Sequence, residues 1–366
     1  MPAAPLSSSR RKNDDDFGDL TCKTLFICIN AIYLGRARRN MLKPPLEQLE
    51  KHYKTIRSRR SYLILKLQAM ISRAAREWLD SYGFLEILPP IIGPVTDPGI
   101  RGAKQATIDY YGKEYKVMSS AILYKQMLAT AFDKIYFFSP NIRLEPIESS
   151  TTGRHLVEFV QIDIEEADVD YKAAMNTAEH LMSYVVNYTR EHGAELLKEL
   201  GRKLPVFTPP FKKITHAEAI EILKTLGEKV NPMAEIPWPQ EEKLSHYMRE
   251  PFFITDYPRG ARGFYDMENP EKPGILKDFD LMYPEGYGEA ASGAEREYKY
   301  AKVLARLRES GENPAKYGWY LDMLRDGIRP SSGFGIGLER LTRYVCGLQA
   351  VWEARPYPKV AGIYSP

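Results

Sequence analysis

Two strand-like segments joined by a polar loop constrain the fold of this 366-residue chain more than any other feature. Residues 134–143 and 155–165 have the pattern of β-strands, and the loop over residues 148–154 is polar. Segments so close in sequence are expected to pair as neighbouring antiparallel strands. Side chains alternate between the two faces of a strand, which places His155, Phe159, Gln161 and Asp163 on one face.

The remaining regular elements indicate a sheet covered by helices. The pattern predicts helices over residues 60–82, 171–200, 214–226, 294–310 and 338–346, and further strands over 84–88, 252–256, 277–283 and 287–291. Strands joined by hairpins and interleaved with helices are typical of an α+β fold. We therefore predict a mostly antiparallel sheet flanked by helices.

Residues 1–45 differ in composition from the rest of the chain. A Ser/Arg/Lys run over residues 7–12 is followed by an acidic triplet at residues 14–16, as in a disordered tail, and Met41 precedes the first regular element. We predict that residues 1–45 are a disordered or mis-assigned N-terminal extension. Residues 46–366 are predicted to form the folded domain.

Charge, cysteine content and hydropathy exclude several classes of protein. The net charge of +3 is too small to indicate nucleic-acid binding by itself. Cys22, Cys28 and Cys346 form no closely spaced framework, which favours a reducing cytoplasm. The apolar run over residues 25–34 is too short to span a bilayer, so we predict no membrane association.

The predicted row of His155, Phe159, Gln161 and Asp163 has the chemistry of a ligand-binding surface. It combines an aromatic face with an amide, a carboxylate and a titratable ring, whereas a core face would be apolar. Arg143, at the end of the neighbouring strand, adds a planar cation suited to phosphate. The alternative is an amphipathic hairpin whose polar face is solvated.

Two further segments carry candidate chemistry. Glycines alternate over residues 333–337 directly before a helix, where backbone N–H groups can face an anion, although a close-packed turn has the same pattern. Glu289 and Ser292 offer hard oxygens of the kind that Mg²⁺ accepts beside phosphates. A capped helix with surface charges is the alternative for this segment.

Together these segments resemble the class II aminoacyl-tRNA synthetases. Residues 83–92, ending near Pro90, are similar to motif 1 of that family; Arg143-Leu144-Glu145 with Phe159 resembles motif 2, and residues 335–340 resemble motif 3. The three motifs occur in order, and the resemblance covers roughly residues 55–360. Within the family, residues 123–126, 158–165 and 292–297 resemble the aspartyl and asparaginyl subgroup.

The resemblance implies the class II catalytic core for residues 46–366, with ATP and Mg²⁺ as cofactors. It implies that Arg143, Arg340 and Glu289 are catalytic, that Arg143 holds the α-phosphate and His155 the γ-phosphate, and that Phe159 and Arg340 enclose the adenine. Glu145, Gln161 and Gly337 would complete the ATP site, and Glu289 and Ser292 would bind Mg²⁺. Asp163 would receive the substrate ammonium, while Lys125 and Arg296 would clamp a carboxylate, which favours aspartate.

A separate question is which molecule accepts the activated aspartate. The anticodon-binding barrel that precedes motif 1 in the family is expected to be missing here, and Ile122 replaces a glutamine that helps hold the amino acid in the tRNA enzymes. In this truncated layout, and in residues 139–143 and 286–289, the chain resembles archaeal paralogues that make asparagine, and Ile122 supports that interpretation. We therefore expect an enzyme that adenylates aspartate and transfers it to ammonia, giving asparagine, AMP and pyrophosphate.

Two other functions remain open at this point. One is aminoacylation of tRNA, in which the basic cluster over residues 51–60 would contact the acceptor stem, although a solvated helix face has the same pattern. The other is a non-catalytic regulatory paralogue, against which the intact Arg143, Glu289 and Arg340 argue. A homodimer is expected, because motif 1 forms the subunit interface in the family.

Overall fold

The computed structural model describes residues 46–98 and 102–366. The extension predicted over residues 1–45, with Cys22 and Cys28, lies outside the described residues. Within the described part, no helix is both long and apolar enough to cross a membrane.

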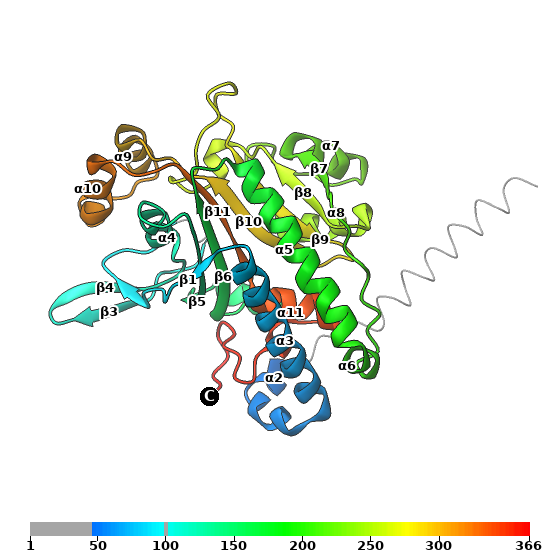
Figure 1. The fold of residues 1–366 in the computed structure, drawn as a ribbon. Helices are drawn as coiled ribbons and strands as arrows, with labels where there is room; N and C mark the ends of the chain where they lie inside the picture. Colours follow the sequence, from blue (N-terminus) through cyan, green and yellow to red (C-terminus); the bar gives the residue numbers. More distant parts are fainter. Residues whose placement is uncertain (1–45, 99–101) are drawn as a thin grey trace, which may run out of the picture. The chain divides into compact units, whose positions relative to one another are not determined.

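An eight-stranded sheet forms the centre of the described structure (Figure 1). In spatial order its strands are β1 (Leu85–Glu86), β5 (Lys134–Ile142), β6 (Glu158–Ala167), β11 (Ser331–Gly337), β10 (Gly288–Glu295), β9 (Asp278–Tyr283), β8 (Phe252–Thr255) and β7 (Lys212–Thr215). The β1–β5 and β7–β8 pairs are parallel and the other five are antiparallel. The predicted fold class, a mostly antiparallel sheet with helices, is therefore confirmed.

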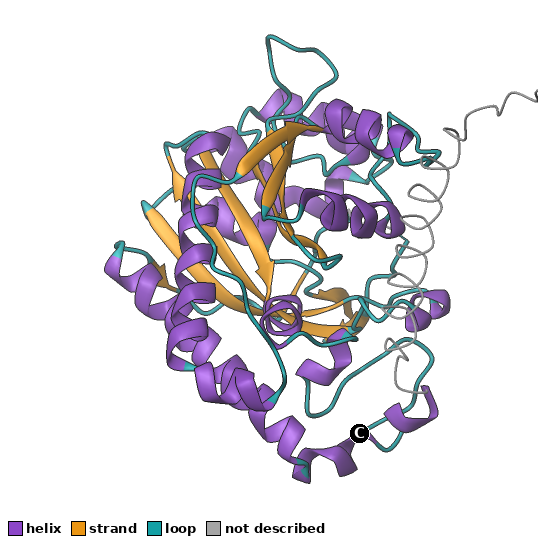
Figure 2. Ribbon diagram, turned by 90° about the vertical axis from the view of Figure 1, so that its right-hand side faces the viewer, coloured by secondary structure: helices purple, strands orange, loops and turns teal. Residues whose placement is uncertain are grey.

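Helices lie along both sides of the sheet (Figure 2). They are α2 (Leu46–Leu49), α3 (Arg59–Ser81), α4 (Ile122–Leu128), α5 (Tyr171–His192), α6 (Ala194–Glu199), α7 (His216–Thr225), α8 (Trp238–Met248), α9 (Tyr300–Glu309), α10 (Gly318–Asp326) and α11 (Leu338–Cys346). A small second sheet consists of β2 (Ile92–Gly93), β4 (Lys113–Val117) and β3 (Thr107–Tyr110).

The alternation of side chains along β6 and β11 shows which face of the sheet packs in the hydrophobic core and which face is free for a ligand. Ile162, Ile164, Phe334 and Ile336 are buried in one hydrophobic cluster with side chains of α3, α5 and α11. The residues between them therefore point to the opposite face, away from α5. On that face Gln161 and Asp163 of β6 lie opposite Gly337 and Gly335 of β11.

The segment predicted as a helix over residues 294–310 is partly wrong. Strand β10 continues to Glu295, and the helix, α9, begins only at Tyr300. The residues of β10 are mostly Ala and Gly, whose local preference does not favour a strand, but they bond to β9 on one side and β11 on the other. Tertiary pairing therefore overrides the local preference.

Two other helices begin or end differently from the prediction. The helix predicted over residues 171–200 is divided at Gly193, where a Cβ would lie 2.6 Å from the Thr189 carbonyl oxygen. The helix predicted from residue 214 begins at His216, because Thr215 and Glu218 form a capping box. The residues before that cap pair with β8 as strand β7.

Candidate active site

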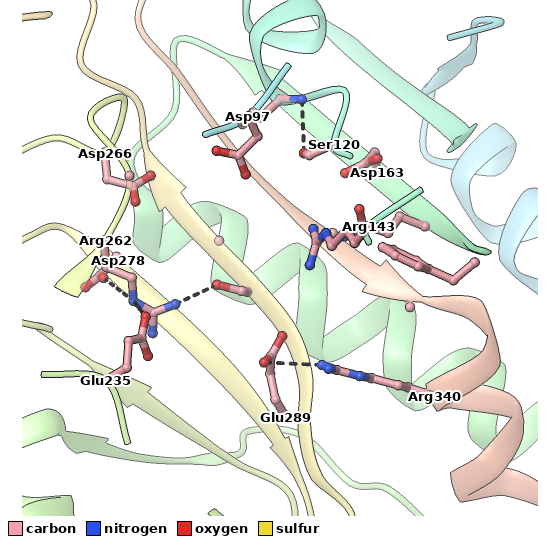
Figure 3. Close-up of a pocket in the computed structure, with 18 of the residues that line it drawn as sticks. Asp97, Ser120, Arg143, Asp163, Glu235, Arg262, Asp266, Asp278, Glu289 and Arg340 are labelled. Carbon is pink, nitrogen blue, oxygen red and sulfur yellow. Dashed lines mark hydrogen bonds and ion pairs between the residues drawn. The ribbon is translucent and has the colours of Figure 1, made fainter. Parts of the chain in front are cut away.

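One cavity of about 570 Å³ lies against the polar face of the sheet (Figure 3). Every residue that the sequence predicts for the site lines this cavity, although they come from three distant parts of the chain. They are Lys125, Arg143, Glu145, His155, Phe159, Gln161, Asp163, Glu289, Ser292, Arg296, Gly337 and Arg340.

Strands β5 and β6 supply the part of the site around Arg143. Phe159, Gln161 and Asp163 are alternate residues of β6, as the predicted row requires, whereas His155 lies before the strand begins. The Nε of Arg143 donates to the Ser119 carbonyl at 3.0 Å, and its guanidinium carbon lies 5.0 Å from the centre of the Phe159 ring. The carbonyl of Ser119 thus fixes Arg143 beside an aromatic face.

A β-bulge in β10 brings Glu289 and Ser292 to the same cavity. In a regular strand, residues three apart point to opposite faces, but the pairing of β10 with β9 shifts between Glu289 and Ala291. Oε2 of Glu289 lies 3.2 Å from Nη1 of Arg340, in the first turn of α11. Glu289 and the proximity of other acidic groups raise the pKa of Arg340 although its burial opposes the charge.

A group of buried charges forms the end of the cavity near α4. Nζ of Lys125 lies 3.2 Å from Oδ1 of Asp163, and Arg296 makes two bonds of 3.1 Å to the two carboxylate oxygens of Glu165. Burial lowers the pKa of Lys125 despite Asp163 and Glu165. Both cations predicted to clamp a substrate carboxylate are therefore already paired within the protein.

The second carboxylate oxygen of Asp163 has a different environment. Oδ2 is buried without a hydrogen-bond partner in the described structure, and Asp163 lines the cavity. A buried carboxylate oxygen is costly unless it is paired. A substrate ammonium group would pair it.

His155 differs electrostatically from the arginines around it. Burial, with the nearby positive charges of Arg340 and Arg154, lowers the pKa of His155 to about 3. Its Nδ1 lies 2.9 Å from Oγ1 of Thr152. His155 is therefore a neutral ring at physiological pH and can offer a phosphate a hydrogen bond but no charge.

The cavity also contains residues that the sequence analysis did not single out. Arg154 is buried and paired with Glu241 of α8 at 3.0 Å, and Arg262 comes from the connection between β8 and β9. Arg154 is the last residue of the polar loop, directly before His155, which is a usable signal for phosphate binding. The sequence around Arg262 gives no comparable indication of phosphate binding, because its position in the cavity depends on how the long connection between β8 and β9 folds.

The glycines of β11 are not equivalent. A Cβ at Gly335 would lie 2.9 Å from Oδ1 of Asp163 and 3.0 Å from Nε2 of Gln161, whereas the nearest atoms to a Cβ at Gly337 are 3.6 Å away. Close packing therefore excludes a side chain at Gly335, and more strongly still at Gly333, where a Cβ would lie even closer to Oε2 of Glu165. Gly337 forms the N-cap of α11, beside Arg340.

The site has oxygens suited to Mg²⁺ but no complete protein cage. Glu289 and Ser292 contribute a carboxylate and a hydroxyl, and no group of three or more His, Cys, Asp or Glu ligands meets anywhere in residues 46–98 and 102–366. Mg²⁺ commonly binds through one or two protein ligands together with substrate phosphates and water. The donor set therefore fits Mg²⁺ that enters with a nucleotide.

Comparison with known proteins decides the family. The model of the class II tRNA synthetases of the D, K and N type matches residues 45–361. The chain belongs to this family. It lies in the aspartyl and asparaginyl subgroup and is an ATP-dependent, AMP-forming ligase, as the sequence motifs predict.

Individual relatives of this class II synthetase include asparagine–tRNA ligases of archaea. The ligase of Pyrococcus abyssi is 36% identical over 313 residues, which cover 84% of this chain and 71% of the relative. The ligase of Thermococcus kodakarensis is also 36% identical, over 83% of this chain and 70% of its own length.

Solved structures show the same similarity. Asparaginyl-tRNA synthetase from Pyrococcus horikoshii, complexed with asparaginyl-adenylate, has a TM-score of 0.83 and 34% identity, covering 88% of this chain and 74% of that one. Aspartyl-tRNA synthetase from Entamoeba histolytica has a TM-score of 0.74 and 27% identity, covering 89% of this chain and 64% of its own.

These relatives overturn the predicted acceptor and partners. The expected reaction of aspartate with ammonia is contradicted, because the similar proteins are asparagine–tRNA ligases. The presence of Ile122 in place of a glutamine did not predict the reaction correctly. The loss of one amide side chain does not show how the other residues of the pocket hold the amino acid. The preference for aspartate rested on Lys125 and Arg296, whose charges are already neutralised within the protein.

The basic cluster before α3 is also partly neutralised. Arg59 binds both carboxylate oxygens of Glu199, and Arg60 pairs with Glu353 at 2.7 Å. Both arginines, at the start of α3, thus form ion pairs within the chain while their own side chains stay largely exposed to solvent.

Proposed function

We propose that this chain activates asparagine with ATP and attaches it to tRNA. The observation that carries the proposal is the unpaired Oδ2 of Asp163 in the same cavity as Arg143 and Arg340. One end of the cavity thus suits an ammonium group and the other suits phosphates. The asparagine–tRNA ligases among the relatives supply the amino acid and the acceptor.

The residues of the cavity divide the chemistry between them. Asp163 binds the ammonium group of the amino acid and so directs its carboxylate toward the nucleotide, while Arg143 binds the α-phosphate. A carboxylate oxygen attacks the α-phosphorus, a new C–O–P linkage forms, and the bond to pyrophosphate breaks. A ribose hydroxyl at the tRNA end then attacks the activated carbonyl, and AMP leaves.

Arg340, Phe159 and His155 bind the rest of the nucleotide. Phe159 offers its ring to the adenine, with Glu145, Gln161 and Gly337 around it, and Arg340 supplies the opposing planar cation. His155 donates a hydrogen bond to the γ-phosphate as a neutral ring.

Mg²⁺ belongs to the same proposal. Glu289 and Ser292 would hold it, and when bound it would neutralise the phosphate charge that develops in the transition state. With the ion held there, Glu289 would give up its bond to Arg340, and the Arg340 guanidinium could then face the nucleotide.

Dimer formation through the segment around β1 completes the proposal. Leu85, Leu88 and Ile91 are 48%, 90% and 61% exposed, although all three are large apolar residues. Such a group on a surface is typical of a protein interface. Light scattering should give twice the chain mass, and Leu88→Asp should reduce it to that of one chain. We also propose a cytoplasmic location, because Cys346, within the described residues, is a buried free thiol.

Pyrophosphate exchange tests the function. With ATP and Mg²⁺, asparagine should support exchange of label between pyrophosphate and ATP, aspartate should support it less, and tRNA should become charged with asparagine. Arg340→Ala should abolish exchange, with Arg259→Gln, on the protein surface, as the matched control. Exchange without any charging of tRNA would refute the proposed acceptor, and absence of exchange with asparagine would refute the proposed amino acid.

A further inference from the structure

Arg262 extends from the connection between β8 and β9 into a group of oxygen atoms in the cavity wall. Its Nη2 lies 2.6 Å from Oδ2 of Asp280, and its Nε lies 3.0 Å from Glu235 and 3.4 Å from Asp278. Its Nη1 donates to Oγ of Ser292 at 3.0 Å. Figure 3 shows Arg262 beside Glu235 and Asp278, with Glu289 reaching toward Arg340.

The guanidinium is held from several directions. Its carbon lies 3.8 Å from the centre of the Tyr257 ring, and the hydroxyl of Tyr257 donates to the same Asp280 oxygen. The Arg262 side chain is only 7% exposed. A guanidinium enclosed in this way keeps one orientation, because its movement would leave the buried carboxylates around it without a partner.

The bond to Ser292 joins this cation to the site. Ser292 and Asp280 are opposite each other in the pairing of β10 with β9, so Arg262 spans neighbouring strands. The same Ser292 oxygen is proposed above to bind Mg²⁺. A divalent ion at that oxygen would lie within a few ångströms of the guanidinium, which repels it strongly in this buried position.

We propose that Arg262 is a positioning residue that holds Ser292 and Asp280 in the nucleotide-free protein, and that it releases Ser292 when Mg²⁺ enters with ATP. The inference rests on the proposed function, because it assumes that ATP and Mg²⁺ bind in this cavity. Glu235 and Asp278 retain the guanidinium after the exchange, so its charge stays paired. Arg262 thereby opposes metal binding, although it contributes no ligand.

Mn²⁺ binding in the presence of α,β-methylene-ATP, followed by electron paramagnetic resonance, tests this role without turnover. Arg262→Gln removes the competing charge and should tighten Mn²⁺ binding by about tenfold. Arg262→Lys keeps the charge but cannot reach Asp280 and Ser292 together, and should tighten binding by a smaller factor. Arg259→Gln is the control: this arginine of the same connection pairs at the surface with Glu268 and Glu309, so affinity should match the wild type.

The outcomes separate the inference from the proposed function. Unchanged or weaker Mn²⁺ binding by both Arg262 variants would overturn the proposed competition between Arg262 and the metal ion. The reason is that replacing an arginine with a purely structural role could only weaken Mn²⁺ binding. If Arg262→Gln does not fold, as judged by circular dichroism, the Lys variant decides the question alone. If the wild type binds no Mn²⁺ with the analogue, the nucleotide site itself is refuted and this inference falls with it.

Discussion

Glu165 is the residue whose replacement should be most costly to the fold. Its side chain is fully buried, accepts two bonds of 3.1 Å from Arg296 and one of 2.8 Å from Ser331, and lies 3.8 Å from Lys125. Glu165→Gln keeps the shape but replaces a charged oxygen by an NH₂ group that faces donors. Among the described residues, Asp266 at 3.4 Å would then be the one charged partner left to the buried Arg296.

The expected loss follows from that geometry. Removing one partner of a buried ion pair costs about 3–5 kcal/mol, because the other charge remains uncompensated. For a domain of this size the loss lowers Tm by roughly 5–10 °C. Replacing both groups by apolar residues, as in Glu165→Leu with Arg296→Met, removes the uncompensated charge and should recover about half of the loss.

Urea unfolding followed by circular dichroism measures these differences, provided that the slope of the transition stays constant. Asp168→Asn is the matched control, since Asp168 lies just after β6 and pairs with Arg329 at 2.6 Å while 56% exposed. The control should leave the midpoint unchanged. A Glu165→Gln midpoint equal to the wild type, or a double variant less stable than the single one, would refute this account of the buried charges.

Three further predictions concern the cavity itself. The folded chain keeps His155 neutral down to about pH 3, whereas the unfolded chain protonates it below about pH 6.5. The free energy of unfolding should therefore decrease by about 1.4 kcal/mol for each pH unit below 6.5. Urea titrations at pH 7.5 and 5.5 should show a smaller decrease for His155→Gln. Gly335→Ala should weaken asparagine binding roughly tenfold in exchange assays, whereas Gly337→Ala should change it little, since only the first Cβ meets Asp163 within 3 Å. Calorimetry should show that ATP binds more tightly with Mg²⁺ than without it, and this difference should shrink in Arg340→Met, because the ion then has no Arg340 to displace from Glu289.

The sequence was sufficient for the parts of the site that lie on regular strands. The alternation of β6 placed Phe159, Gln161 and Asp163 on one face, and the structure brings all three to the cavity. Arg340 was equally predictable, because a helix that starts after the glycines of β11 has its first turn at the end of that strand. These positions depend on local periodicity, which a single sequence contains.

Other features depend on contacts that a single sequence does not contain. Glu289 and Ser292 were predicted beside a helix start, yet they share a face through a bulge in a strand. Arg262 reaches the cavity from a connection without periodicity, and only the positions of Asp280 and Ser292 on paired strands explain its place. The amino acid was predicted wrongly for a related reason, because a lysine in a pocket indicates a bound carboxylate only if no carboxylate of the protein already pairs with it.

Neutralisation within the protein explains how so many charges can be buried together. Lys125 is paired with Asp163, Arg296 with Glu165, and Arg340 with Glu289, so that each of these three cations has an anion from another element of the sheet or its helices. A nucleotide that binds Arg340 without the metal would take Arg340 away from Glu289, and a metal ion that binds Glu289 without the nucleotide would take Glu289 away from Arg340, so either one alone would break a partly buried ion pair. Under the proposed function the two costs would cancel only when nucleotide and metal arrive together, since each takes one partner of the pair. The same ion pair would then make the site selective for a metal–nucleotide complex over either component.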